Sequence, residues 1–459
     1  MSKNAAMLVV IALASLAVNF ATLTRSPTIA EDEVAFTEPA LNLATGHGFT
    51  FPGWNDGRFW TGNAPLYPLL LSCWLRVVPF SIAGVRSLNV LIALAAFLIV
   101  IAAAMRHGLI EKPALLFAAL LCAYSISFSY RGGRYDALCM LLFALVLLAT
   151  TLAGWRRYAL LVFGAFFMPA AGLLLPACAG VVSLVLLIAY RRSVLRDLTV
   201  FWIAMLAGVA ALLLLYAQNG VLQDFLTLIG RHSVVHGANV ETTSFNSLSR
   251  KWRRLPLALW ADKVNLLLVA LVAFLGWRRR SRLLWTAIAV AVVLPLTIEF
   301  LYMYRIYYGW MIAIPLLVVL ASFRDSKCAT LALLIVIVTG LPARTLLAVL
   351  EWRSRDYAPV EALAARNIGP DDTVYADFAA YYAVRSRTPH IALPLQRFPP
   401  YVFHPPAATL LIIGGESAED VKSFAGTWTE VDRYTAVPSF RRSFGAAPYD
   451  LHVYRRRRV

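Results

Sequence analysis

The sequence is poor in charged residues and lacks the common motifs of soluble enzymes. Charged residues make up 15% of its 459 residues, while hydrophobic residues make up 60%. A soluble domain is closer to ~25% charged and ~45–50% apolar. The chain has no Walker loop, no dinucleotide fingerprint and no Asp-x-Asp motif of the kind that holds a metal-bound nucleotide sugar. These absences argue against a soluble nucleotide-dependent enzyme.

Cysteine is also scarce. The five cysteines lie in or beside apolar runs, and none has the spacing of paired metal ligands. We therefore expect no disulfide framework, and each thiol is expected to act as a small packing residue. These residues are Cys73, Cys122, Cys139, Cys178 and Cys328.

The net charge of +17 does not indicate nucleic-acid binding. The basic residues fall in short clusters between apolar runs, as the positive-inside rule predicts for a membrane protein. The clusters lie at 106–112, 156–157, 191–196, 278–282 and 324–327. The closing run Arg455 to Arg458 is distant from any span and is expected to be a solvated tail.

Repeated apolar runs of about 15–20 residues predict a mostly α, polytopic membrane protein with about eleven transmembrane helices. No small-x-small cleavage site precedes Thr24, so we expect the first segment to be an uncleaved anchor. The run 158–190 is too long for one crossing, and prolines near its middle predict two short helices. The expected spans are 7–23, 86–105, 113–128, 135–153, two within 158–190, 198–216, 255–277, 283–300, 309–323 and 329–346.

An odd number of spans places the first loop and the tail on the same outer side. The first loop, 24–63, carries five acidic residues against two arginines, which also favours the outside. Helical periodicity begins at Glu33, and the proline-containing segment 64–80 is expected to lie at the membrane interface. The segment 217–263 is predicted to be a long polar loop.

Two domains are predicted: a membrane domain over 1–346 and a small external α/β domain over 351–459. In the second, strands are expected at 373–376, 407–413 and 451–454, with helices at 360–366 and 418–424.

Three consecutive acids, Glu31, Asp32 and Glu33, follow the first span directly. Acids at the mouth of a span are costly unless they face water or take part in chemistry. They could stabilise the start of a helix through its dipole. Alternatively, Asp32 could act as a general base at the membrane boundary.

Other outer junctions carry polar and aromatic residues in a recurring order. Pro65-Leu66-Tyr67 follows the acidic loop, and Arg86 begins the second span. Asp136 opens a later span, and Arg305 lies among tyrosines that include Tyr304 and Tyr307.

In this order, these features resemble the GT-C glycosyltransferases, in the branch of protein O-mannosyltransferases, lipid A aminoarabinose transferase and related bacterial enzymes. The resemblance extends from the first segment through Pro315 and more loosely over the tail. It implies transfer of a sugar from a polyprenyl-phosphate donor to an outer-face acceptor, with inversion. Asp32 matches the catalytic acid and Glu33 its neighbour, so the resemblance implies Asp32 and Glu33 as the candidate catalytic acids. The implied location is the bacterial inner membrane, with the acidic loop and C-terminal domain on the periplasmic side.

Arg305 and Arg86 are the candidates to bind the leaving phosphate, where charge develops. Each could instead be an interfacial arginine extending toward lipid headgroups. Asp136 could orient the acceptor or an arginine, or simply begin a helix. Tyr304, Tyr307 and Tyr67 complete the predicted substrate-binding set, although Tyr67 could equally anchor the loop at the headgroups.

The resemblance also has departures. Relatives often carry Lys-Pro where this chain has Asn63-Ala64-Pro65, and Lys-Gly in the segment around Met168 to Gly172. Without these lysines, the donor is handled differently or other arginines replace them.

No metal site is predicted, because His232 and His236 have no third ligand nearby. A divalent metal is nevertheless left open, and no cofactor is certain beyond the lipid-linked donor. The expected partners are membrane lipids and a glycolipid, polysaccharide or protein acceptor.

Two other functions remain open. A transporter or flippase of lipid-linked sugars should show repeat symmetry and ionisable residues at mid-membrane. The charges here gather at one surface, which favours the enzyme. A membrane assembly factor whose tail binds a partner would keep its function after Asp32→Asn.

Overall fold

The computed structural model describes residues 3–55, 57–235, 245–277, 281–301, 304–323, 326–394, 407–415, 421–436 and 449–457. Its contacts divide the chain into two compact units. The helical unit consists of Met1–Val18, Thr61–Tyr67 and Asn89–Ala343. The mixed unit consists of Asn19–Trp60, Pro68–Leu88 and Arg344–Val459, so it joins most of the acidic first loop to the C-terminal residues.

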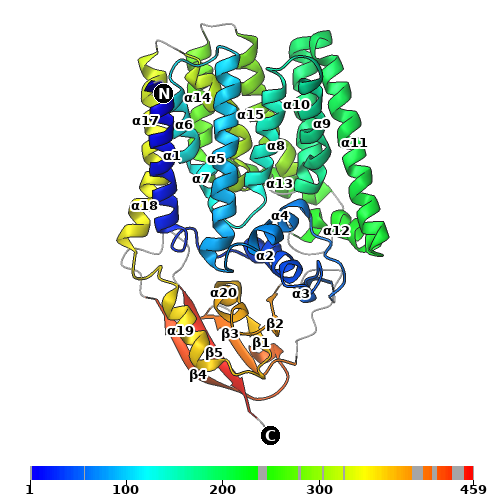
Figure 1. Cartoon of the computed structure of the whole chain (residues 1–459), viewed down its shortest axis with the longest axis vertical. Helices are drawn as coiled ribbons and strands as arrows, with labels where there is room; N and C mark the ends of the chain where they lie inside the picture. The colour runs from blue at the N-terminus through cyan, green and yellow to red at the C-terminus, as the bar shows by residue number, and fades with distance from the viewer. Residues whose placement is uncertain are drawn as a thin grey trace. The chain divides into compact units, whose positions relative to one another are not determined.

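Each predicted span coincides with a helix or with a pair of helices (Figure 1). Apolar side chains on all faces favour helices here, because the backbone must satisfy its own hydrogen bonds in lipid. The helices are α1 (Lys3–Thr22), α5 (Ile82–Arg106), α6 (Pro113–Cys122), α7 (Tyr124–Arg131), α8 (Asp136–Ala149), α9 (Gly154–Ala171), α10 (Leu174–Tyr190), α11 (Leu195–Gln218), α14 (Lys263–Gly276), α15 (Arg282–Leu301), α16 (Trp310–Ala321), α17 (Lys327–Thr339) and α18 (Leu341–Leu350).

Within the described residues, five helical segments are long and apolar enough to cross a membrane. A sixth is added if α6 and α7, bent by 60° relative to each other, form one broken span. The run 158–190 divides into α9 and α10 around Gly172, as predicted. The total of eleven spans stays a prediction.

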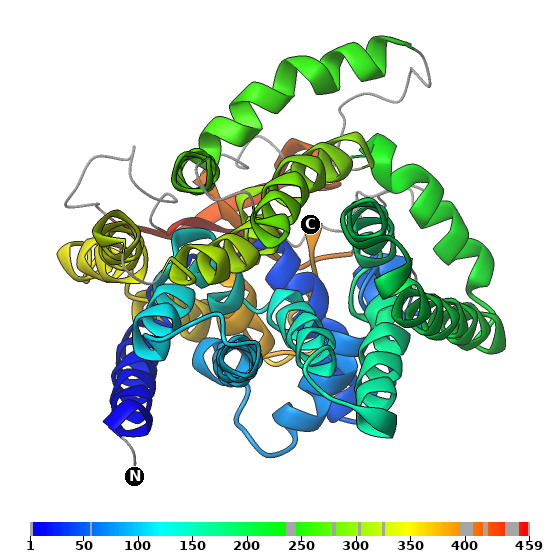
Figure 2. The ribbon, with the colours of Figure 1, turned by 90° about the horizontal axis from the view of Figure 1, so that it is seen from above.

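Close helix packing in the helical unit depends on small residues. Helix α9 packs against both α8 and α11, which run side by side with it when the ribbon is seen from above (Figure 2). On α11, a Cβ added at Gly208 would lie 2.0 Å from the carbonyl oxygen of Phe166 on α9. Glycine at this position therefore allows the two backbones to approach.

The prediction of a polar loop over 217–263 is wrong. Two helices occupy most of it, α12 (Leu222–Val235) and α13 (Phe245–Ala261). Both have one apolar and one polar face. The polar face lowers the mean hydropathy of the segment, so polarity alone predicts a loop there. His232 lies in α12, whereas His236 falls outside the described residues.

The predicted span 255–277 is also interrupted. Helix α13 ends at Ala261 and α14 begins at Lys263, because Asp262 between them has a non-helical backbone (φ −105°, ψ 41°). Hydrogen bonds to the Asp262 side chain from Tyr304 and Asn265 accompany this break.

In the mixed unit, the acidic loop folds into helix α2 (Glu31–Ala44), followed by short helices α3 (Pro52–Asn55) and α4 (Leu66–Leu75). The predicted interfacial helix is thus shorter than 64–80. Trp60 is 1% exposed and meets Phe36 and Phe49 edge-on, at centroid distances of 5.8 and 5.6 Å. Through Phe36, this aromatic cluster packs α2 against the residues that follow it.

The C-terminal residues form a five-stranded mixed sheet of order β2-β1-β3-β5-β4. Strands β1, β2 and β3 are parallel, whereas β5 pairs antiparallel with β3 and β4. The strands are β1 (Val374–Ala376), β2 (Ile391–Ala392), β3 (Leu410–Gly414), β4 (Trp428–Thr435) and β5 (Asp450–Arg456). Helices α19 (Ala358–Asn367) and α20 (Tyr381–Arg385) complete this part.

The predicted strands correspond to β1, β3 and β5, and the helix at 360–366 to α19. Strand β4 was not predicted, because it is an edge strand of largely polar residues and shows little apolar alternation. The predicted helix at 418–424 lies partly outside the described residues, and residues 421–423 form a 3-10 turn.

Candidate functional site

The three acids occupy the first turn of α2, where carboxylates favour the positive end of the helix dipole. Asp32 is partly exposed, whereas Glu33 is 1% exposed. Burial raises the pKa of the Glu31 carboxyl above its ordinary value. The turn therefore presents carboxylates in different environments, and Asp32 is less buried than Glu33.

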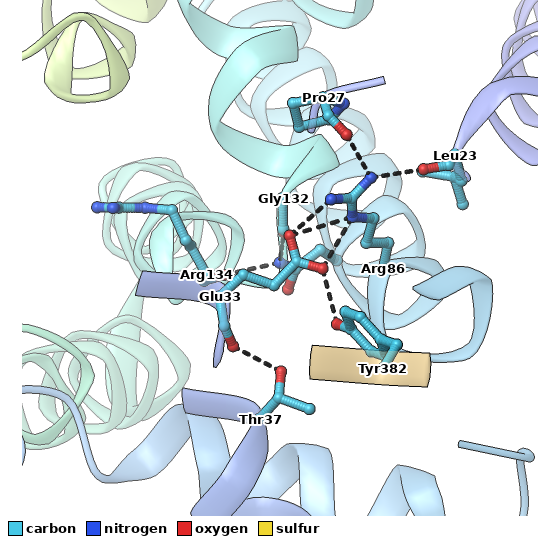
Figure 3. Close-up of polar contacts among 9 residues, drawn as sticks. Leu23, Pro27, Glu33, Thr37, Arg86, Gly132, Arg134 and Tyr382 are labelled. Atoms are coloured by element: carbon cyan, nitrogen blue, oxygen red, sulfur yellow. Dashed lines mark hydrogen bonds and ion pairs between the residues drawn. The ribbon is translucent and has the colours of Figure 1, made fainter. Parts of the chain in front are cut away.

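Glu33 is fixed by a buried ion pair with Arg86 (Figure 3). The Arg86 Nη2 atom lies 2.7 Å from Glu33 Oε2, and Arg86 Nε donates to Oε1 at 2.9 Å. Arg86 Nη1 donates to the carbonyl oxygens of Leu23 and Pro27, at 2.6 and 2.7 Å. Arg86 thus joins the chain before α2 to the first turn of α2, and Asp32 lies between these two attachment points in sequence.

The predicted contact of Arg86 with donor phosphate is not supported by this geometry. Its side chain is 0% exposed. One N–H group from Nε, two from Nη1 and one from Nη2 already donate to the chain itself. The arrangement indicates a residue that holds the acidic turn in place.

Two consecutive tyrosines of α20 also bind acids of α2. Tyr382 donates its hydroxyl to Glu33 Oε1 at 2.7 Å, and Tyr381 donates to Glu38 Oε2 at 2.7 Å. Glu38 is 2% exposed and also pairs with Arg385, whose Nε lies 3.1 Å from both carboxylate oxygens. Burial and the neighbouring carboxylates raise the pKa of both tyrosines well above the ordinary value, so both remain protonated donors at neutral pH.

In the helical unit, Asp136 pairs with an arginine that the sequence reading did not single out. Arg134 Nε lies 2.9 Å from Asp136 Oδ2, and Trp310 Nε1 donates to Asp136 Oδ1 at 3.4 Å. The Arg134 guanidinium lies 3.7 Å from the centroid of the Tyr307 ring, within cation–π range. Of the alternatives for Asp136, this geometry favours the one in which it orients an arginine partner.

Tyr304 and Asp262 form a second buried cluster in the same unit. Tyr304 donates its hydroxyl to Asp262 Oδ2 at 2.5 Å, and its backbone N–H donates to Glu299 Oε2 at 2.7 Å. Asn265 donates to Asp262 Oδ2 at 2.8 Å and to the carbonyl oxygen of Gly309 at 2.9 Å. Together these bonds fix both ends of the segment that carries Arg305.

Arg305 itself is exposed, and it forms no ion pair with any other residue that the structure describes. It is therefore available to an external anion. Tyr67 is fully buried at the start of α4, and a substrate contact for it stays a prediction. Among the described residues, no group of three or more His, Cys, Asp or Glu side chains could hold a metal ion.

Sequence reasoning missed Tyr382, Arg134 and Asp262. Tyr382 is 349 residues from its partner Glu33, so no local signal connects them. Arg134 could have been found, because it lies two residues before Asp136 in the same motif.

The fold defined by these elements is shared with two solved structures. The structure matches that of ArnT from Cupriavidus metallidurans bound to undecaprenyl phosphate, with a TM-score of 0.62 and 13% identity over 97% of both chains. It also matches the Archaeoglobus fulgidus oligosaccharyltransferase in the apo form, with a TM-score of 0.51 and 12% identity over 86% of this chain. The match spans 65% of the archaeal chain.

No family model matches the sequence, and no curated protein matches it. At 12–13% identity, the structural matches establish the polytopic helical fold with its C-terminal sheet.

Proposed function

We propose that the protein is an integral-membrane glycosyltransferase that moves a sugar from a polyprenyl-phosphate donor to an acceptor on the outer face of the membrane. The observation that carries the proposal is the likeness, over nearly the whole of both chains, to an ArnT structure that binds undecaprenyl phosphate. The acidic turn of α2 supports it, because this turn supplies a partly exposed carboxylate beside a rigid buried ion pair.

In the proposed reaction, Asp32 takes the proton from the acceptor hydroxyl as the hydroxyl oxygen attacks the anomeric carbon. A new glycosidic C–O bond forms while the bond between the anomeric carbon and the phosphate oxygen breaks. The electron pair of the broken bond leaves with the polyprenyl phosphate, and the anomeric centre inverts. The acidic loop and the C-terminal residues are proposed to face the periplasm of a bacterial inner membrane.

Arg305 is the proposed ligand of the leaving phosphate. Its exposed guanidinium can donate two parallel hydrogen bonds to phosphate oxygens, which gain charge in the transition state. The bonds of Tyr304 to Asp262 and Glu299 hold the backbone beside it in one conformation. The fixed backbone limits where the Arg305 side chain can reach, and a cation placed at the leaving group stabilises the charge that develops there.

Mass spectrometry of envelope glycolipids tests the function. Cells that make the protein should carry a glycolipid heavier by one sugar than cells that lack it, and the mass difference identifies the sugar. If the lipids are unchanged, the wall polysaccharides and outer proteins are analysed in the same way. In a third outcome, all three fractions are unchanged, and cells that lack the protein accumulate lipid-linked sugar on the inner face of the membrane. A transporter function would then replace the enzymatic one.

Replacing Arg305 by alanine should weaken binding of undecaprenyl phosphate by about 10- to 100-fold, the cost of roughly 1.5–3 kcal/mol for a lost charged hydrogen bond. Native mass spectrometry of the purified protein with undecaprenyl phosphate measures the dissociation constant. Arg387→Ala, which removes another exposed arginine, is the control and should leave binding unchanged. Equal affinities for the Arg305 variant and the wild type would remove Arg305 from the phosphate site.

A further inference from the structure

Helix α20 connects the C-terminal sheet to the acidic helix α2 through paired contacts. The neighbouring residues Tyr381 and Tyr382 each donate one hydroxyl hydrogen bond of 2.7 Å, but to different acids, Glu38 and Glu33. Both tyrosine rings also contact Phe80. The ring of Tyr382 stacks on that of Phe80 with a centroid distance of 5.3 Å, while the ring of Tyr381 meets it edge-on at 6.0 Å.

The two acids differ in what else holds them. Glu38 is bound by Arg385, a residue of α20 itself, which also donates to Asn42 at 2.9 Å. Glu33 is bound by Arg86, so Tyr382 supplies a hydrogen bond from the C-terminal residues to that ion pair (Figure 3). Tyr381 and Arg385 therefore dock α20 onto the body of α2, whereas Tyr382 acts on its first turn.

We propose that Tyr382 is a positioning residue for the transfer reaction, acting through Glu33 to hold the first turn of α2 and thereby the carboxylate of Asp32. The inference rests on the proposed function, in which Asp32 is the general base. It gives the C-terminal residues a defined part in catalysis.

The physical reason is the number of bonds that restrain Glu33 Oε1. This oxygen accepts from Arg86 Nε at 2.9 Å and from the Tyr382 hydroxyl at 2.7 Å. Without the hydroxyl, Oε1 keeps only the bond from Arg86 Nε, and Oε2 keeps the bond from Arg86 Nη2 at 2.7 Å. The carboxylate then loses its hydrogen bond from α20 and is restrained by Arg86 alone, so its position is less tightly defined. Asp32 directly precedes Glu33 in the same helical turn, so a loosened turn broadens the position of the base. Displacements of about 1 Å at a reacting group can lower a rate by roughly 10²-fold.

Two variants with the same chemical change separate this role from docking. Tyr382→Phe and Tyr381→Phe each remove one buried hydroxyl and keep the ring that contacts Phe80. Transfer is followed as formation of the sugar-bearing product in right-side-out membrane vesicles that contain their own donor and acceptor. Donor affinity is followed separately as the dissociation constant for undecaprenyl phosphate.

For Tyr382→Phe we expect a fall in transfer rate of about 10-fold or more, with the dissociation constant for undecaprenyl phosphate unchanged. For Tyr381→Phe we expect a rate within about twofold of the wild type, although both variants lose a hydroxyl of the same kind. Equal rates for the two variants would overturn the proposal. So would a rate loss in Tyr382→Phe that is accompanied by an equal loss of donor binding, because that pattern describes a general structural defect.

Asp32→Asn, measured in the same vesicles, separates this proposal from the proposed function. If Asp32→Asn transfers sugar normally, the function assigned to the acidic turn is wrong whatever the tyrosine variants do. If Asp32→Asn is inactive and Tyr382→Phe matches the wild type, only the positioning role of Tyr382 is wrong.

Discussion

Replacing Asp32 by asparagine should lower the transfer rate by about 10²–10⁴-fold, the usual contribution of a positioned general base. Asparagine has nearly the same shape as aspartate but cannot accept the proton of the acceptor hydroxyl. Asp32 is partly exposed, whereas the neighbouring Glu33 carries the buried ion pair that fixes the turn. The variant should therefore insert and fold like the wild type. Product formation in whole cells, with the amount of protein in the membrane measured in parallel, gives the rate per molecule.

Glu31→Gln is the matched control for Asp32→Asn. It neutralises another acid in the same first turn of α2 and changes the charge by the same amount. If both variants lose activity equally, the loss comes from the negative charge of the turn and not from a base at Asp32. Normal turnover by Asp32→Asn would exclude Asp32 as the base.

Removing Arg86 alone should destabilise the protein by about 3–5 kcal/mol, because it leaves a buried carboxylate without its counter-ion. Glu33 is 1% exposed, so water cannot replace the guanidinium without local opening of the structure. The carbonyl oxygens of Leu23 and Pro27 lose their donor as well. For Arg86→Met, we expect a large fall in the apparent melting temperature of the purified protein and faster proteolysis of the first loop.

The double variant Glu33→Leu/Arg86→Met should recover part of this loss, because it removes both charges and leaves neither ion uncompensated. Recovery should be incomplete, since the Tyr382 hydroxyl and the two carbonyl oxygens remain without partners. The control is Arg366→Met, which removes an arginine paired with Asp432 at the surface and should change stability by less than about 1 kcal/mol. A single Arg86 variant as stable as the Arg366 variant would show that the buried pair does not hold the mixed unit together.

Much of the fold follows from the sequence because local patterns decide it. The apolar runs became helices in every predicted span, since a backbone surrounded by apolar side chains and lipid must bond to itself. Glycine and prolines near the middle of 158–190 predicted the break between α9 and α10. The strands β1 and β3 were visible as short apolar segments because both are buried in the middle of the sheet.

The wrong predictions of secondary structure concern segments in which polar residues lie on helices or interrupt them. Helices α12 and α13 lie in a segment whose polarity predicts a loop, since their polar faces lower its mean hydropathy. The sequence predicts one helix over the span 255–277, because nothing local to Asp262 shows that Tyr304 and Asn265 bind its side chain.

By itself, the sequence determined which segments are apolar helices and where three acids interrupt them, because both depend on neighbouring residues along the chain. Only the tertiary structure decided what each acid does. Glu33 is paired with Arg86, 53 residues away, and with Tyr382, 349 residues away. Residues so far apart meet only after the chain has folded, and burial then makes their pairing obligatory, because an unpaired charge away from water is costly. For this reason Glu33 and Arg86, which the sequence offered as a catalytic acid and a phosphate ligand, form a buried ion pair in the structure, while Asp32 lies partly exposed beside it.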